Sequence, residues 1–139
     1  MASRNGTRVV ITGMGAITPL GNSVSEFWQA CVEGKSGIGY VTQFDATGYP
    51  SRIAGEVKGF DPQDYMDRRA ARRMSRFSQF AVAASHQALQ AAELDLRREE
   101  DPGRVGVLLG NGIGGLPNIE AAVHTIREKG GMRIDPFFM

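Results

Sequence analysis

Residues 68–94 read RRAARRMSRFSQFAVAASHQALQAAEL, and we expect the rest of the chain to pack around this stretch. Its first third carries five arginines: Arg68, Arg69, Arg72, Arg73 and Arg76. The remainder is almost entirely small or apolar, and the absence of Pro and Gly favours a helix throughout. Apolar residues lie on more than one side of the second half, which is typical of a helix buried on several faces. The stretch therefore predicts one long helix that begins at a basic surface and ends in the core, where its alanines allow close packing.

The arginine cluster is a local feature of a chain whose overall charge is balanced. The chain has 139 residues, a normal length for one domain, and 42% of them are hydrophobic, which is enough for a core. The net charge is only +1, so nothing global indicates nucleic acid or a membrane as partner. A single cysteine excludes an internal disulfide and favours a cytoplasmic setting. No window reaches transmembrane length.

Three β-rich segments are predicted as strands. Residues 8–12 (RVVIT) and 104–110 (RVGVLLG) are apolar runs typical of buried strands, and residues 52–57 (RIAGEV) predict a short strand near a sheet edge. Residues 35–50 are expected to form a loop, and residues 60–66 a turn or short helix. Strands that alternate with helices predict an α/β sheet with helices on both faces.

Two further helices have recognisable ends. Ser23, followed three residues later by Glu26, is a capping-box pattern, and Gly34 suits the C-terminal end of the helix that follows. An apolar stripe at helical spacing runs along it: Val24, Phe27, Trp28, Cys31 and Val32. Pro117 fits the first turn of another helix, which Gly130 should end.

Candidate nucleophiles and bases are few. Cys31 is the only thiol, and its place on the apolar stripe predicts a buried, inert cysteine, because burial disfavours the thiolate. His86 and His124 are possible general bases in principle. His124 follows Glu120 by four residues, but no second cysteine or acidic cluster accompanies either histidine at metal-ligand spacing, so we expect no metal site.

Two glycine-rich turns admit more than one interpretation. Gly13 and Gly15 follow a predicted strand, as in dinucleotide-binding turns, but Thr18 stands where that pattern needs its third glycine. A nucleotide-binding domain is therefore kept as one alternative. Residues 110–115 are either an anion-binding nest or a tight turn that another backbone or a substrate chain approaches closely.

The arginine cluster is the strongest positional signal. Its members fall on two neighbouring helical rows: Arg68, Arg72 and Arg76 on one, Arg69 and Arg73 on the other. Cations at a helix N-terminus oppose the helix dipole, and the upstream acids offset part of this cost: Asp61, Asp64 and Asp67. The cluster is either a solvated face with local ion pairs or a docking patch. An acidic protein is favoured over nucleic acid, because the chain is otherwise neutral and no aromatic residues interleave for base stacking.

The last eight residues, MRIDPFFM, depart from the usual polar chain end. An apolar terminus of this kind should pack against another part of a protein. We therefore expect the chain to be a fragment of a longer protein.

Six segments occur in a recognisable order. They are RVVITGMGAITPLGN (8–22), EGKSGI (33–38), FDATGYPSRIAGEVKGFDP (44–62), RRAARRMSRFSQFAVAA (68–84), RVGVLLGNGIGGL (104–116) and IDPFFM (134–139). Together they resemble the N-terminal third of the β-ketoacyl-[acyl carrier protein] synthases, and the resemblance covers essentially the whole chain. The segments GNGIGGL and DPFF look most like the type II elongating enzyme.

The resemblance implies a fold and an activity. It implies part of the first half of a thiolase-like layered α/β/α/β/α fold, with residues 1–139 as an incomplete N-terminal portion of the synthase domain. The parent enzyme would be a homodimer that needs no cofactor and elongates fatty acids. It would condense malonyl-acyl carrier protein, with loss of CO2, onto an acyl chain held by a cysteine. The catalytic cysteine, two histidines and a lysine of the family are expected downstream of Met139.

The resemblance also assigns binding residues in this chain. Arg69, Arg72 and Arg73 match the family's docking helix for acyl carrier protein, a strongly acidic, phosphopantetheine-bearing partner. Ile113 matches a residue that lines the acyl pocket, and Phe137 and Phe138 match a segment near the dimer interface that reaches this pocket. The alternative is a non-catalytic module that docks carrier protein or assembles with a complementary fragment. Nucleic acid and membrane are not expected as partners.

Overall fold

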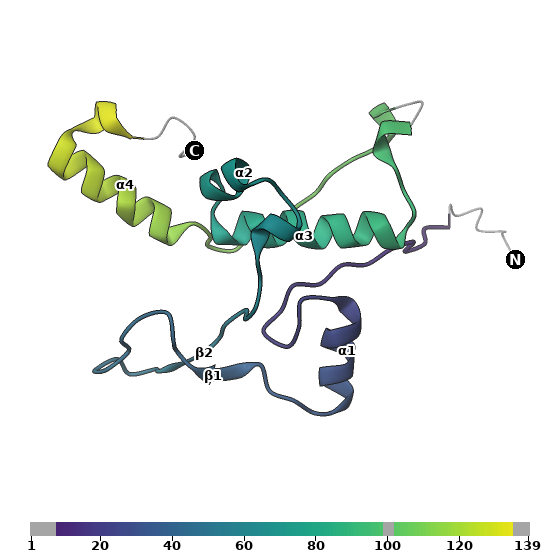
Figure 1. The fold of residues 1–139 in the computed structure, drawn as a ribbon, viewed down its shortest axis with the longest axis horizontal. Coiled ribbons are helices and arrows are strands. Elements are labelled where there is room, and N and C mark those ends of the chain that lie inside the picture. Colours follow the sequence, from purple (N-terminus) through teal and green to yellow (C-terminus); the bar gives the residue numbers. More distant parts are fainter. Residues whose placement is uncertain (1–7, 99–101, 135–139) are drawn as a thin grey trace, which may run out of the picture.

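The computed structural model describes residues 8–98 and 102–134. Its elements follow the order α1 (Val24–Val32), β1 (Ile38–Tyr40), β2 (Ile53–Gly55), α2 (Arg68–Arg73), α3 (Arg76–Ala91) and α4 (Leu116–Lys129), with short 3-10 turns at Pro62–Asp64, Leu96–Arg98, Pro102–Arg104 and Gly131–Arg133. The long helix α3 lies at the centre, α2 lies over its N-terminal end, and α4 extends beyond that end (Figure 1). No helix in the described part is long and apolar enough to cross a membrane.

Helix α3 holds the most deeply buried residue of the described part of the chain. Ala83 is completely buried. A side chain at Gly13 would overlap the carbonyl oxygen of Ala88, and one at Gly15 would overlap that of Ala84. The predicted close approach at the alanines of this helix is therefore confirmed, and the partner that approaches is the N-terminal segment.

A single side chain of α3 holds that segment in place. The amide of Gln87 accepts a hydrogen bond from the Ala16 N–H at 3.0 Å and donates one to the Asn22 carbonyl at 2.7 Å. It also donates to the Tyr65 hydroxyl at 3.0 Å. Gln87 thus ties the chain before α1 and the turn before α2 to the middle of α3.

Helix α1 begins and ends as predicted, but its apolar stripe is not buried. The Ser23 hydroxyl accepts from the Glu26 N–H at 3.2 Å, the Glu26 carboxylate accepts from the Asn22 N–H at 2.8 Å, and Gly34 has a φ of +69°. Trp28 is 66% exposed and Cys31 is exposed. Val24 and Phe27 are half-buried, but the expectation of a buried Cys31 is wrong, because no described residue covers the stripe at Trp28 and Cys31.

The sheet differs most from the prediction. The strand expected at residues 52–57 is present as β2, but its antiparallel partner β1 lies in the predicted loop, with Tyr40 opposite Ile53. Residues 8–12 and 104–110 form no strand among the described residues. A strand needs a neighbour for its backbone hydrogen bonds, and these segments have none here.

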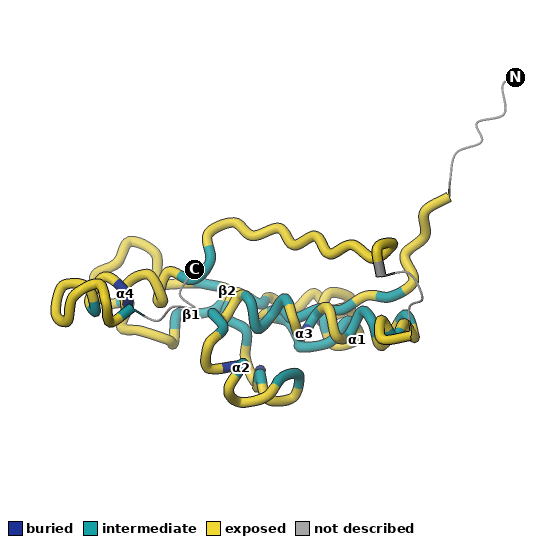
Figure 2. The backbone as a smooth tube through the Cα atoms, turned by 90° about the horizontal axis from the view of Figure 1, so that it is seen from above, coloured by how far each residue is buried: buried dark blue, intermediate teal, exposed yellow. Residues whose placement is uncertain are grey.

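The second of these segments shows the consequence for burial. Residues 104–110 run alongside α3 as an exposed, extended chain (Figure 2). Leu108 is 97% exposed. The apolar pattern that predicted a buried strand is therefore correct about extended backbone and wrong about burial within the described residues.

The predicted long helix is divided in two. Met74 and Ser75 have extended backbones, with φ and ψ of −89° and 139° and of −64° and 154°. The prediction of one continuous helix from Arg68 is therefore wrong. Helix α4 agrees with its predicted ends, since Pro117 lies in its first turn and Gly130 caps it.

Candidate functional site

Helix α2 presents the arginine cluster to solvent. Its sequence, RRAARR, places two alanines between two pairs of arginines. Ala71 is 7% exposed and anchors the helix, while Arg69, Arg72 and Arg73 are exposed. One short turn of helix therefore separates a buried alanine face from a basic outer face.

The ends of α2 suit its charges. The Asp67 carboxylate accepts hydrogen bonds from the Arg69 and Ala70 N–H groups at 2.8 and 2.9 Å. Because the helix ends after Arg73, Arg72 and Arg73 occupy its last turn, where the dipole favours cations. The predicted cost of these two arginines at a helix N-terminus is therefore wrong, since the break reverses their position relative to the dipole.

Gln79 of α3 fixes the other end of α2. Its side-chain amide donates to the Ala71 carbonyl at 2.8 Å and lies 3.4 Å from the Met74 carbonyl. These carbonyls lie at the C-terminal end of α2, where backbone acceptors lack intrahelical partners. The pattern of apolar residues gave no sign of this contact, because a glutamine on a helix has no distinctive spacing.

Two arginines of the basic face, Arg69 and Arg72, have no acidic partner among the described residues. No carboxylate of residues 8–98 or 102–134 forms an ion pair with Arg69 or Arg72. The interpretation of the cluster as a face of local ion pairs is therefore not supported for these two residues. Their charges remain available to a partner.

The second glycine-rich turn packs against the same end of α3. A side chain at Gly114 would lie 2.6 Å from the Phe77 ring, and one at Gly115, whose φ is +72°, 3.3 Å from the Ser75 hydroxyl. Close approach therefore explains these two glycines. Ile113, beside them, is 85% exposed, and Phe137 and Phe138 lie outside the described residues.

The first glycine-rich turn has a structural role. Both Gly13 and Gly15 face the backbone of α3, which fills the space that a Cβ would take. The nucleotide-binding alternative rested on these two glycines, and their close packing against the helix gives a sufficient reason for them.

The possible nucleophile and bases lie on three different helices. Cys31 is on α1, His86 on α3 and His124 on α4. Among the described residues, no three side chains of the metal-binding types come together. His86 packs edge-on against Tyr65, with ring centroids 5.9 Å apart.

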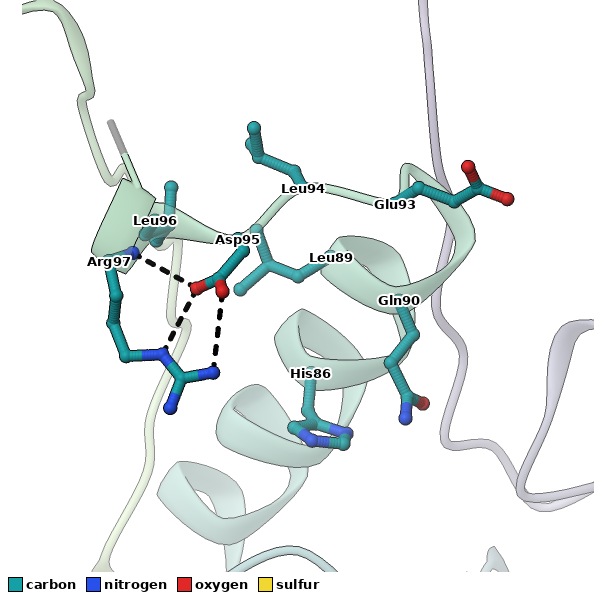
Figure 3. A pocket seen from close by; sticks show the side chains of 8 residues that line it. All are labelled: His86, Leu89, Gln90, Glu93, Leu94, Asp95, Leu96 and Arg97. Atoms are coloured by element: carbon teal, nitrogen blue, oxygen red, sulfur yellow. Dashed lines mark hydrogen bonds and ion pairs between the residues drawn. The ribbon is translucent and has the colours of Figure 1, made fainter. Parts of the chain in front are cut away.

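A hollow lies at the opposite end of α3 from α2. Figure 3 shows it lined by His86, Leu89, Gln90, Glu93, Leu94, Asp95, Leu96 and Arg97. Hydrogen bonds from Arg97 lower the pKa of Asp95, and the Arg97 Nε lies 3.0 Å from its carboxylate. None of the predicted binding residues lines this hollow, and Asp95, one of its two acids, is already paired.

The chain belongs to the β-ketoacyl synthase family. A family model described as "Beta-ketoacyl synthase, N-terminal domain" matches residues 6–138. This match confirms the resemblance inferred from the six segments.

Within this family, the chain is similar to curated proteins named 3-oxoacyl-[acyl-carrier-protein] synthase 2. The chain is 46% identical over 139 residues to 3-oxoacyl-[acyl-carrier-protein] synthase 2 of Synechocystis sp. and covers 33% of that protein. It is 48% identical over 132 residues to the synthase 2 of Vibrio harveyi, and this match covers 95% of the chain and 32% of the relative. The chain thus spans about a third of the length of the curated relatives that it matches.

Solved structures confirm the fold class. A β-ketoacyl synthase from Burkholderia phymatum matches with a TM-score of 0.73 and 32% identity, over 93% of this chain and 32% of that one. A second match is a type II polyketide acyl-carrier protein in complex with its ketosynthase, with a TM-score of 0.73 and 29% identity, over 92% of this chain and 33% of that chain. The α/β thiolase-like fold is thereby confirmed, and the described residues form part of it.

Proposed function

We propose that the chain is the carrier-binding, N-terminal portion of a fatty-acid-elongating β-ketoacyl-acyl carrier protein synthase of the type II kind. The whole enzyme would join an acyl group to the two-carbon unit left when malonyl-acyl carrier protein loses CO2. The names of the curated relatives support this substrate class. Residues 1–139 would form an incomplete part of the synthase domain, and the whole enzyme would act as a cytoplasmic homodimer without a cofactor.

The chain's own contribution is docking. Arg69, Arg72 and Arg73 would bind the acidic surface of acyl carrier protein, and electrostatic complementarity would guide its approach and orientation. Ile113, with Phe137 and Phe138, would line the acyl pocket. The catalytic cysteine, histidines and lysine would lie outside this chain.

One observation carries the docking proposal. The arginines of α2 form a fixed, exposed basic face, and no described carboxylate pairs with Arg69 or Arg72. The Asp67 cap and the Gln79 contact fix the backbone of α2, so little backbone ordering is needed on binding. A similar ketosynthase has been solved with its acyl-carrier protein, which supports this kind of partner.

The position of Ile113 is consistent with this arrangement. The glycines beside it pack against Ser75 and Phe77, at the junction between α2 and α3. A carrier docked on α2 would thus arrive near the turn that holds Ile113. Delivery of an acyl chain toward that turn would need only a short path.

A condensation assay with the 139-residue chain tests both parts of the proposal. We expect the chain to bind acyl carrier protein and to release no CO2 from malonyl-acyl carrier protein. Turnover by this chain would contradict the placement of the catalytic residues elsewhere. Absence of any complex would contradict the docking role.

A further inference from the structure

Arg76 differs from the other arginines in how it is held. It is the first residue of α3, and its guanidinium carbon lies 4.9 Å from the ring centroid of Phe60 and 4.9 Å from that of Phe80. The two rings meet edge to face, with centroids 5.0 Å apart, so the guanidinium sits in the corner between them. Phe60 is buried, which makes this corner a rigid seat.

Within the described chain, the charge of Arg76 meets aromatic rings and no acidic group. No carboxylate among residues 8–98 and 102–134 forms an ion pair with it. At the first position of a helix, its charge also opposes the dipole. The stability of α3 therefore gives no reason for a cation at this position. The contacts with the two rings stabilise the cation instead.

Stacking leaves the hydrogen-bonding groups of the arginine accessible. Because the two rings are inclined at 78°, the planar guanidinium can lie flat on only one of them, and the N–H donors that do not face the other ring are left for a partner. Arg76 remains exposed despite the two rings. It also follows Arg73 by only three residues, across the extended Met74–Ser75 link, so a further exposed arginine stands at the start of α3, next to α2 in the chain.

We propose that Arg76 is a fourth carrier-binding cation, fixed by Phe60 and Phe80, which continues the docking surface from α2 to the start of α3. This inference rests on the proposed function, because it takes acyl carrier protein as the acidic partner. Long basic side chains normally lose rotamer freedom when they bind. A guanidinium already seated between two rings loses less, so Arg76 would orient the carrier as well as attract it.

The test measures the affinity and association rate of acyl carrier protein for Arg76→Gln and Arg76→Lys across a range of salt concentrations. We expect Arg76→Gln to weaken binding by about twofold to fivefold at low salt, as for one exposed ion pair. Its association rate should depend less steeply on salt, and Arg76→Lys should restore most of the loss. Arg52→Glu, at an exposed arginine next to β2, is the control and should change affinity little.

The outcomes separate a docking role from a structural one. Circular dichroism and unfolding of each variant show whether α3 is intact. If Arg76→Gln lowers stability but leaves the salt dependence of association unchanged, Arg76 only stabilises the packing of Phe60 and Phe80, and the inference fails. Arg72→Glu, in the basic face of α2, is measured in the same way. If Arg72→Glu weakens binding and Arg76→Gln does not, the inference fails while the proposed function stands. If neither variant weakens binding, both fail.

Discussion

Glycines and one glutamine determine how the N-terminal segment meets α3. Gly13 and Gly15 allow the backbone to lie directly on the helix, and Gln87 supplies the hydrogen bonds that hold it there. Both features are contacts between residues about 70 positions apart. The sequence indicates the glycines, but the same Gly-x-Gly spacing also fits a nucleotide-binding turn. Their role becomes clear only when the helix is placed against them.

The close approach at Gly15 predicts a large effect of the smallest substitution. In Gly15→Ala the new methyl group would overlap the Ala84 carbonyl, so the backbone must move. We expect the free energy of unfolding to fall by about 1–3 kcal/mol, as for overpacked sites. Chemical denaturation measures it. The control is Gly106→Ala, where the methyl group meets open space and the change should stay within about 0.5 kcal/mol. Equal effects of the two substitutions would show that the packing at Gly15 is not tight.

The carboxylate of Glu56 predicts a local pH dependence. Hydrogen bonds from the Thr42 hydroxyl, at 2.6 Å, and from the Thr42 N–H, at 3.0 Å, lower the pKa of Glu56. A lowered pKa in the folded chain means that these contacts stabilise the loop above the ordinary glutamate pKa. This stabilisation is lost as the pH falls through the lowered value.

NMR titration of the side chain measures this shift. The Glu56 carboxyl should titrate below the ordinary glutamate range, and Thr42→Val should move its pKa back up, because the hydroxyl donor is removed. A Glu56 pKa that is not lowered in the wild-type chain would contradict the hydrogen bonds between Thr42 and Glu56.

At the scale of elements, the helix ends could be predicted better than the helix interiors. The signals at Ser23, Gly34, Pro117 and Gly130 are local, because a cap depends on residues within one turn, and all four are confirmed. The break after Arg73 has only one local signal, Ser75, which is the N-cap residue of α3 but makes no capping hydrogen bond with its side chain. It depends on Gln79, which satisfies the carbonyls exposed by the break, and this contact forms between two elements.

Gln79 therefore has a testable role in the shape of the docking surface. In Gln79→Ala the Ala71 carbonyl loses its donor, and we expect a loss of about 1 kcal/mol in stability. The amides in the last turn of α2 should also exchange faster with solvent, which hydrogen-exchange NMR detects. Gln90→Ala is the matched control, since Gln90 is an exposed glutamine on the same helix. Unchanged exchange in α2 would show that Gln79 does not hold this helix.

At the scale of the whole chain, the family could be identified from the sequence, but of the described sheet only β2 was predicted. Six segments in order identify the β-ketoacyl synthases, and the family match and the structural neighbours confirm them. The strand predictions failed where pairing is needed. Residues 8–12 and 104–110 have the apolar pattern of buried strands, yet no described strand lies beside them. The pattern of side chains predicts which faces of a strand are apolar. The strand itself forms only where a neighbouring backbone supplies its hydrogen bonds.

For the candidate site, the structure gives the exposure of the predicted docking residues, whereas their role in binding stays a prediction. Arg69, Arg72 and Arg73 are exposed as a docking role needs, while the seat of Arg76 between Phe60 and Phe80 joins residues on different elements. Aromatic residues separated by 20 positions give no sequence signal for a shared cation. The roles of Ile113, Phe137 and Phe138 in an acyl pocket stay predictions.

The binding of acyl carrier protein to the chain and to its Arg69→Glu/Arg72→Glu/Arg73→Glu variant tests the docking proposal most directly. The wild-type chain should bind with an affinity that falls as salt rises, because exposed charges are screened over about 10 Å at 0.1 M salt. The triple variant should bind at least about tenfold more weakly at low salt, because it places like charges opposite the acidic carrier. Arg52→Glu should bind as the wild type does. Equal affinity of the wild-type chain and the triple variant would contradict the docking surface.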